Sequence, residues 1–137
     1  MDVENLDQVR IEYADSLCGV PDQFSRLWTP HRMTYIDGEN KPKTSQSKDC
    51  PFCISPGKTD EDGLIVHRGQ HAFVVMNLYP YSSGHMLVCP YRHVSWYWDL
   101  TEDETNEISL LTKQAMETAM QVMKPAGFNL GINQGDV

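Results

Sequence analysis

Residues 63–94, GLIVHRGQHAFVVMNLYPYSSGHMLVCPYRHV, decide the fold, because three short apolar runs in this stretch are separated by turn residues. The first two runs, GLIVHRG and HAFVVMN, are rich in β-branched residues and meet at Gly69-Gln70, a pattern that is typical of a β-hairpin. LYPYSSG has the composition of a turn, and the third run, HMLVCPY, ends at Pro90. The stretch therefore predicts three neighbouring strands.

A long amphipathic helix is predicted after these strands. Thr101, with Glu104 three residues later, has the capping-box pattern that begins helices. Apolar residues then recur every three or four positions, which predicts one buried helix face made of Ile108, Leu111, Ala115, Ala119 and Val122. Pro125 ends the helix, because proline cannot continue one.

The segment after the helix, GFNLGINQG (127–135), alternates apolar and polar residues and predicts a fourth strand. The predicted order is three strands, one long helix and one strand. This order indicates an α+β domain in which an antiparallel sheet packs against one long helix.

Length and charge limit the class of protein. A chain of 137 residues is the size of a single domain. The net charge of -8 argues against sequence-independent nucleic-acid binding, which needs a basic surface. The sequence has neither a signal-peptide pattern at its start nor an apolar run long enough to span a membrane, so we expect a cytoplasmic protein.

The chain divides into two parts. Residues 1–49 form an N-terminal extension, in which VPDQFSRLWTPHRMTYI is rich in aromatic residues. Large aromatic side chains bury apolar surface, so we expect this extension to pack on the domain formed by residues 50–137.

Two cysteines, Cys50 and Cys53, lie in the motif CPFC and have the spacing of half a tetrahedral zinc site. Histidines that could complete such a site are His67, His71, His85 and His93. A redox-active pair and two packed thiols are the alternatives that the spacing leaves open. Cys89 lies in an apolar run, and we interpret it as a buried, small apolar residue.

Four polar residues at predicted strand ends are further candidates for a site. His85 and His93 flank the third strand eight positions apart, so strand alternation places them on the same face. Asn77 ends the second strand, and Asn133 ends the last one between two glycines. Glycine allows a ligand such as a phosphate to approach the backbone closely.

Together, these segments resemble the histidine triad (HIT) superfamily. The resemblance covers residues 50–137 and rests on CPFC, the hairpin, VVMNLYPYSSGHMLVCPYRHV, the long helix and GFNLGINQG, in that order. LWTPHRMTYI resembles an actinobacterial branch that includes diadenosine tetraphosphate phosphorylases. The resemblance implies an α+β fold, a homodimer or higher homo-oligomer, and adenine nucleotides or dinucleoside polyphosphates as ligands, with phosphate as a co-substrate in that branch.

The same resemblance implies roles for four residues of a nucleotide site. Asn77 corresponds to a residue that contacts the ribose, and Phe73 lies in the strand that helps to enclose the base. Asn133 corresponds to a residue that reaches the reacting phosphate. His85 corresponds to a histidine that supports the catalytic histidines and helps to hold their tautomer.

In zinc-containing members of the superfamily, Cys50, Cys53 and His93 would supply three ligands of a structural zinc ion. The resemblance also implies a motif His-x-His-x-His, which provides the nucleophile, and a fourth zinc ligand that is a histidine just ahead of that nucleophile; both are absent up to Val137. We therefore expect a truncated form of a nucleotidyltransferase or hydrolase, most simply a diadenosine tetraphosphate phosphorylase. Two alternatives stay open: a non-catalytic nucleotide-binding or interaction module, and a zinc domain whose fourth ligand is His67 or His71.

Overall fold

The computed structural model describes residues 48–135. Most of the predicted N-terminal extension, 1–49, lies outside the described residues. The elements in chain order are α3 (Pro51–Ile54), the 3-10 helix η2 (Ser55–Gly57), α4 (Asp60–Gly63), β1 (Ile65–Arg68), β2 (Ala72–Met76), β3 (Met86–Pro90), the 3-10 helix η3 (Tyr97–Asp99) and α5 (Glu102–Met123).

The three strands form one antiparallel sheet in the order β1-β2-β3, which confirms the three predicted strands and the hairpin. In the register of β2 with β3, Phe73 lies opposite Cys89 and Val74 lies opposite Val88. The central strand β2 has the uninterrupted apolar sequence AFVVM, because both of its faces are buried.

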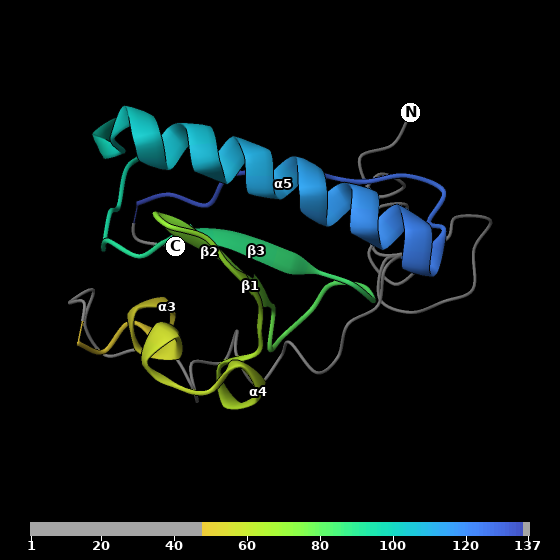
Figure 1. The fold of residues 1–137 in the computed structure, drawn as a ribbon, viewed down its shortest axis with the longest axis horizontal. Coiled ribbons are helices and arrows are strands. Elements are labelled where there is room, and N and C mark those ends of the chain that lie inside the picture. Colours follow the sequence, from red (N-terminus) through yellow and green to blue (C-terminus); the bar gives the residue numbers. More distant parts are fainter. Residues whose placement is uncertain (1–47, 136–137) are drawn as a thin grey trace, which may run out of the picture.

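Helix α5 covers one face of the sheet, and the short helices α3 and α4 lie on the opposite side (Figure 1). The core between α5 and the sheet contains Ala72, Val74 and Leu111, with Met86, Val88, Ile108 and Ala115 packed against them. The core on the opposite face contains Ile65, Phe73 and Val75, with Leu87, Cys89 and Tyr91 packed against them. The predicted α+β class, with an antiparallel sheet and one long helix, is therefore confirmed.

The start of α5 has the predicted capping box. The backbone N–H of Glu104 donates to Oγ1 of Thr101 at 3.2 Å, and the backbone N–H of Thr101 donates to Oε2 of Glu104 at 2.8 Å. The predicted apolar face is correct except at Val122, which is 76% exposed. A helix of 22 residues is about 33 Å long and a five-residue strand about 17 Å, so the last turns of α5 extend past the sheet.

The predicted fourth strand is wrong. Residues 127–135 contain no helix or strand, and the apolar residues that suggested alternation are exposed: Phe128 at 43%, Leu130 at 69% and Ile132 at 62%. A strand requires a neighbouring strand to accept and donate its backbone hydrogen bonds. Within residues 48–135 the sheet has three strands, and none of them pairs with this segment.

Candidate functional site

Asn77 and His85 lie side by side at one end of the sheet, where β2 ends and β3 begins. The backbone N–H of Asn77 donates to the carbonyl oxygen of His85 at 2.9 Å, which closes the loop between the two strands. Asn77 Nδ2 lies 3.4 Å from both ring nitrogens of His85, and Asn77 Oδ1 accepts from the backbone N–H of Tyr79 at 2.9 Å. The structure therefore brings together two of the residues that the resemblance assigns to a nucleotide site.

The His85 ring is held by Tyr81 from within the same loop. The backbone N–H of Tyr81 donates to Nδ1 of His85 at 3.0 Å, and the two rings stack with centroids 5.3 Å apart and an interplanar angle of 18°. A neutral imidazole whose Nδ1 accepts a hydrogen bond carries its proton on Nε2. This contact accordingly makes Nε2 the hydrogen-bond donor of His85. Sequence reasoning missed Tyr81, although its spacing from His85 within a turn was a usable signal.

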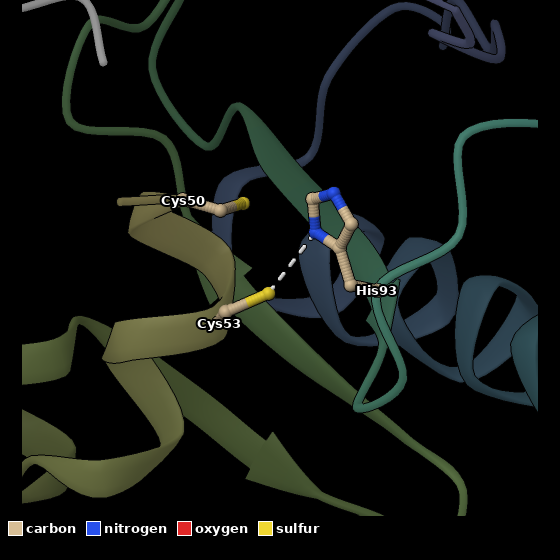
Figure 2. A group of neighbouring side chains, drawn as sticks. All are labelled: Cys50, Cys53 and His93. Carbon is tan, nitrogen blue, oxygen red and sulfur yellow. Dashed lines mark hydrogen bonds between the residues drawn. The ribbon is translucent and has the colours of Figure 1, made fainter. Parts of the chain in front are cut away.

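The second site is formed by Cys50, Cys53 and His93, whose ligand atoms all lie within 4.8 Å of one another. Figure 2 shows the thiols of Cys50, which precedes α3, and of Cys53, on α3, facing the imidazole of His93, whose Nδ1 lies 3.2 Å from Sγ of Cys53. Ligand atoms of a tetrahedral zinc ion with sulfur and nitrogen ligands are separated by roughly 3.5–3.8 Å. These three side chains form a group that could hold a metal ion, and they are the three that the resemblance implied.

Local structure positions the two cysteines. Cys50 is the N-cap of α3, and Pro51 occupies the first helical position, where its missing N–H costs nothing. Arg68 on β1 connects residues 56–60, which follow α3, to the sheet. Its guanidinium donates to Oδ1 of Asp60 at 2.8 Å and to the carbonyl oxygens of Pro56 and Lys58 at 2.9 and 3.1 Å.

Burial raises the pKa values of two thiols in this region. Burial, followed by the neighbouring Cys50, raises the pKa of Cys53 to about 11. Burial also raises the pKa of Cys89 to about 12, with smaller contributions from Cys50 and Cys53. Without a metal these two thiols are protonated at neutral pH, and zinc binding would release protons from its cysteine ligands.

The other histidines within residues 48–135, which are His67, His71 and His85, do not join this group. His67 lines a groove between the sheet and α5, together with Val66, Val74, Met86, Leu111, Gln114, Ala115, Glu117, Thr118 and Gln121. The backbone N–H of His71 hydrogen-bonds to the carboxylate of Glu107. His85 and His93 were predicted to share a face, but β3 ends at Pro90, and the two histidines lie beyond opposite ends of that strand. They belong to two different groups.

Asn133 lies towards the end of β3 that is distant from Asn77. The backbone N–H of Gly135 donates to the carbonyl oxygen of Ser95 at 2.8 Å, and Oε1 of Gln134 accepts from the backbone N–H of Tyr97 at 3.1 Å. These contacts hold the segment that contains Asn133 against the loop after β3, where Figure 1 shows the C-terminal end. The structure does not bring Asn133 next to Asn77 and His85.

Phe73 lies in β2, as predicted, but its side chain is completely buried. Its ring stacks on Tyr91, with centroids 5.2 Å apart and an interplanar angle of 29°. In the described part of the chain, Phe73 is a core residue. A completely buried ring offers no surface that a base could contact directly.

Comparisons with known proteins identify the class to which this fold and these two sites belong. Residues 37–126 match the family model described as "Protein similar to CwfJ C-terminal". The chain belongs to this family of HIT-like proteins. The match contains the cysteine pair, Asn77, His85 and His93, whereas Asn133 lies beyond it.

Three relatives are informative. The chain is 44% identical over 120 residues to the "AP-4-A phosphorylase" of Mycobacterium tuberculosis, an alignment that covers 85% of this chain and 62% of the relative. It is 31% identical over 90 residues to an "Uncharacterized 16.1 kDa HIT-like protein" of Mycoplasma pneumoniae, covering 65% and 61% of the two chains. It is 40% identical over 107 residues to a "Nitrilase and fragile histidine triad fusion protein NitFhit" of Caenorhabditis elegans, covering 78% and 23%. The chain thus spans less than two thirds of the length of these relatives.

Within residues 48–135, no helix is both long enough and apolar enough to cross a membrane.

Proposed function

We propose that this chain is the nucleotide-binding part of a HIT-family nucleotidyl-transferring enzyme, a phosphorylase of diadenosine tetraphosphate. The observation that carries the proposal is its 44% identity with a mycobacterial "AP-4-A phosphorylase" over 85% of the chain. The paired Asn77 and His85 support it, because the resemblance assigns Asn77 to the ribose and His85 to the support of the catalytic histidines, and the two side chains lie next to each other. We also propose, as part of the same function, that the enzyme is cytoplasmic and forms a homodimer.

The proposed reaction consists of two displacements at an α-phosphate. A neutral imidazole of the family's triad attacks, the phosphate-oxygen bond to the leaving nucleotide breaks, and a nucleotidyl-histidine forms. Inorganic phosphate then attacks the same phosphorus and releases the histidine, so diadenosine tetraphosphate and phosphate yield ATP and ADP. The nucleophilic histidine of this scheme is implied by the family and matches none of the motifs in this chain.

Two described residues have proposed roles in these steps. His85, whose proton lies on Nε2, would donate a hydrogen bond to the triad and so hold the tautomer of its neighbour. By the resemblance, Asn133 would donate its amide N–H to an oxygen of the reacting phosphate as negative charge grows there, although in this structure its segment is held at the other end of β3 from His85. Asn77 would hydrogen-bond to the ribose.

Cys50, Cys53 and His93 are proposed ligands of a structural zinc ion. Such an ion would fix the position of α3 relative to the loop after β3, and it takes no part in the displacement. Three ligands are present in the described group, and a fourth is required for a closed tetrahedral site.

Product analysis with the full-length protein tests the proposed function. Diadenosine tetraphosphate is incubated with and without inorganic phosphate, and the nucleotides are separated. A phosphorylase yields ATP and ADP and requires phosphate, whereas a hydrolase yields ATP and AMP without it. If neither reaction occurs although the nucleotide binds, the chain is a non-catalytic nucleotide-binding module, and the proposed activity is wrong.

The role of Asn133 is tested with Asn133→Ala in the same protein. We expect kcat to fall by about 100-fold, the usual effect of removing one donor to a developing oxyanion, with a much smaller change in KM. Asn129→Ala is the matched control, since Asn129 is an exposed asparagine in the same segment. Equal kcat values for Asn133→Ala and wild type would contradict the assigned role.

A further inference from the structure

The loop between β2 and β3, residues 77–85, is closed by hydrogen bonds that converge on its two end residues. The backbone N–H of Asn77 donates to the carbonyl oxygen of His85 at 2.9 Å. Within the loop, the backbone N–H of His85 donates to the carbonyl oxygen of Ser82 at 3.1 Å, and that of Tyr79 donates to Oδ1 of Asn77 at 2.9 Å. These bonds fix the backbone that leads to His85.

The glycine of this loop rests against the end of α5. Gly84 has a positive φ of 77°, and an added Cβ atom there would collide with Cε of Met123 and come within 3.0 Å of its Sδ. A positive φ favours glycine, and the absence of a side chain leaves the space that the methionine occupies. The residue directly before His85 is therefore packed against the long helix, which supports the loop.

On this supported loop, Tyr81 makes two contacts with the imidazole of His85. Its backbone N–H donates to Nδ1 at 3.0 Å. Its ring lies nearly parallel to the imidazole, with centroids 5.3 Å apart and an interplanar angle of 18°, an offset arrangement that aromatic rings prefer. One residue thus holds the imidazole both at a ring nitrogen and across a ring face.

These two contacts act on a torsion that the histidine side chain itself leaves soft. Rotation of an imidazole about its Cβ–Cγ bond is broad and roughly two-fold, so the surroundings must decide the direction and the plane of the ring. A half-turn of the His85 ring would put Cδ2 in place of Nδ1 and remove the acceptor from the Tyr81 N–H. The hydrogen bond therefore selects one of two ring orientations, and the stack holds the plane of the ring in that orientation.

We propose that Tyr81 is a positioning residue whose ring keeps the His85 imidazole in the orientation that leaves Nε2–H as the donor for the catalytic histidines. This inference rests on the proposed function, in which His85 supports those histidines. Because His85 has no proposed contact with the substrate, a loosened ring affects the chemical step and not substrate binding. The expected consequence of losing the stack is a lower kcat at nearly constant KM.

Nitrogen NMR of the full-length protein with isotope-labelled histidine tests the proposal without relying on activity. The resonances of His85 are those that disappear in His85→Gln. Above the ordinary histidine pKa of about 6.5, the wild type is expected to show His85 protonated at Nε2 and unprotonated at Nδ1. Tyr81→Ala, and Tyr81→Leu as a bulkier variant without an aromatic face, should move these resonances towards the tautomer mixture of a free imidazole. Tyr81→Phe keeps the stack and should restore the wild-type pattern.

Tyr97→Ala is the matched control, because Tyr97 is a tyrosine of similar exposure, 42% against 50% for Tyr81, and lies on η3 beyond the other end of β3. It should leave the His85 resonances unchanged. In turnover of diadenosine tetraphosphate, Tyr81→Ala is expected to lower kcat by about two- to tenfold, the effect of losing one aromatic pair, with KM within about twofold. Tyr81→Phe should recover most of this loss.

A wild-type His85 that is protonated at Nδ1 would overturn the proposal. So would His85 resonances that stay unchanged in both Tyr81→Ala and Tyr81→Leu, a Tyr81→Phe variant that behaves like Tyr81→Ala, or an unchanged kcat where the resonances do move. If the wild type shows the expected tautomer but turns over no dinucleotide with phosphate or with water, the proposed function fails, whereas the hold of Tyr81 on His85 stands.

Discussion

Arg92 holds the carboxylate of Glu104 through two hydrogen bonds, from Nε to Oε1 at 3.0 Å and from Nη2 to Oε2 at 2.8 Å. Nη2 also donates to the carbonyl oxygen of Asp99 at 2.8 Å, and Glu104 completes the capping box with Thr101. One buried carboxylate therefore joins the segment after β3 to the start of α5. The loop between Arg92 and Glu104 carries His93 and the stacked rings of Trp96 and Trp98. The positions of these side chains therefore depend on the Arg92–Glu104 pair.

Glu104→Gln is expected to lower the free energy of unfolding by about 1–3 kcal/mol, because the charge-assisted bonds to Arg92 are lost in a buried position. Denaturant titration measures this change. Glu102→Gln is the control, since Glu102 is an exposed acidic residue in the same helical turn. Equal losses in the two variants would show that helix charge, and not the pair with Arg92, stabilises this region.

The contribution of Glu104 to the free energy of unfolding also depends on pH. The hydrogen bond from Arg92, followed by that from the Thr101 backbone, lowers the pKa of Glu104 from 4.5 to about 2. Because the folded pKa lies below the unfolded one, the stabilisation is complete above about 4.5 and disappears as the pH falls through about 2. Thermal melts should therefore show the wild type and Glu104→Gln converging in stability across this range. A constant difference down to about pH 2 would contradict the lowered pKa.

Glu107 on α5 accepts hydrogen bonds from three consecutive backbone N–H groups in the β1–β2 turn: Gln70 at 2.9 Å, His71, and Ala72 at 2.7 Å. The bond from Gln70, followed by that from His71, lowers the pKa of Glu107. Glu107→Gln is expected to lower Tm and to speed hydrogen exchange at these three amides, because the neutral side chain accepts through only one oxygen. Glu117→Gln, an exposed change on the same helix, should alter neither measurement.

The same turn constrains Gly69. A Cβ atom at this position would come within 2.8 Å of the Ala72 carbonyl oxygen and of Cδ of Glu107. If Glu107→Gln leaves the exchange of the turn amides unchanged, the close approach at Gly69, and not the carboxylate, orders the turn.

Cys50→Ser is expected to remove bound zinc and to lower the free energy of unfolding by several kcal/mol, because metal binding at a structural site contributes directly to folding. Zinc is measured by metal analysis after purification, and stability by thermal melting with and without a chelator. Cys89→Ala is the control, because Cys89 packs in the core outside the three-residue group. A zinc-free wild type whose melting is insensitive to the chelator would show that the thiols hold no metal.

Phe73→Ala is expected to lower the free energy of unfolding by about 3–5 kcal/mol, the usual effect of removing a fully buried aromatic ring. Phe128→Ala removes a ring that is 43% exposed and should cost far less. Adenine-nucleotide affinity, measured where Phe73→Ala stays folded, should also fall if the ring supports the base. Unchanged affinity in the folded variant would place the base elsewhere.

Much of the fold could be predicted from the sequence because its signals are local. The three strands and the capping box at Thr101 follow from neighbouring residues, and each appears where the pattern indicates it. The prediction of a fourth strand was wrong for a physical reason. Alternation in GFNLGINQG expresses a preference for extended backbone, whereas a strand also needs a partner, and residues 48–135 provide none beside it.

The sequence by itself determined the α+β class, the family resemblance and the candidate residues, since these depend on residue type and short spacing. Only the tertiary structure decided which candidates meet. It placed His93 beside Cys53 across 40 residues, separated His93 from His85, and buried Phe73. It also paired Arg92 with Glu104 and set Glu107 against the β1–β2 turn. Such contacts arise when the chain folds back on itself and buries its apolar faces, and no local pattern specifies the distance between residues brought together in that way.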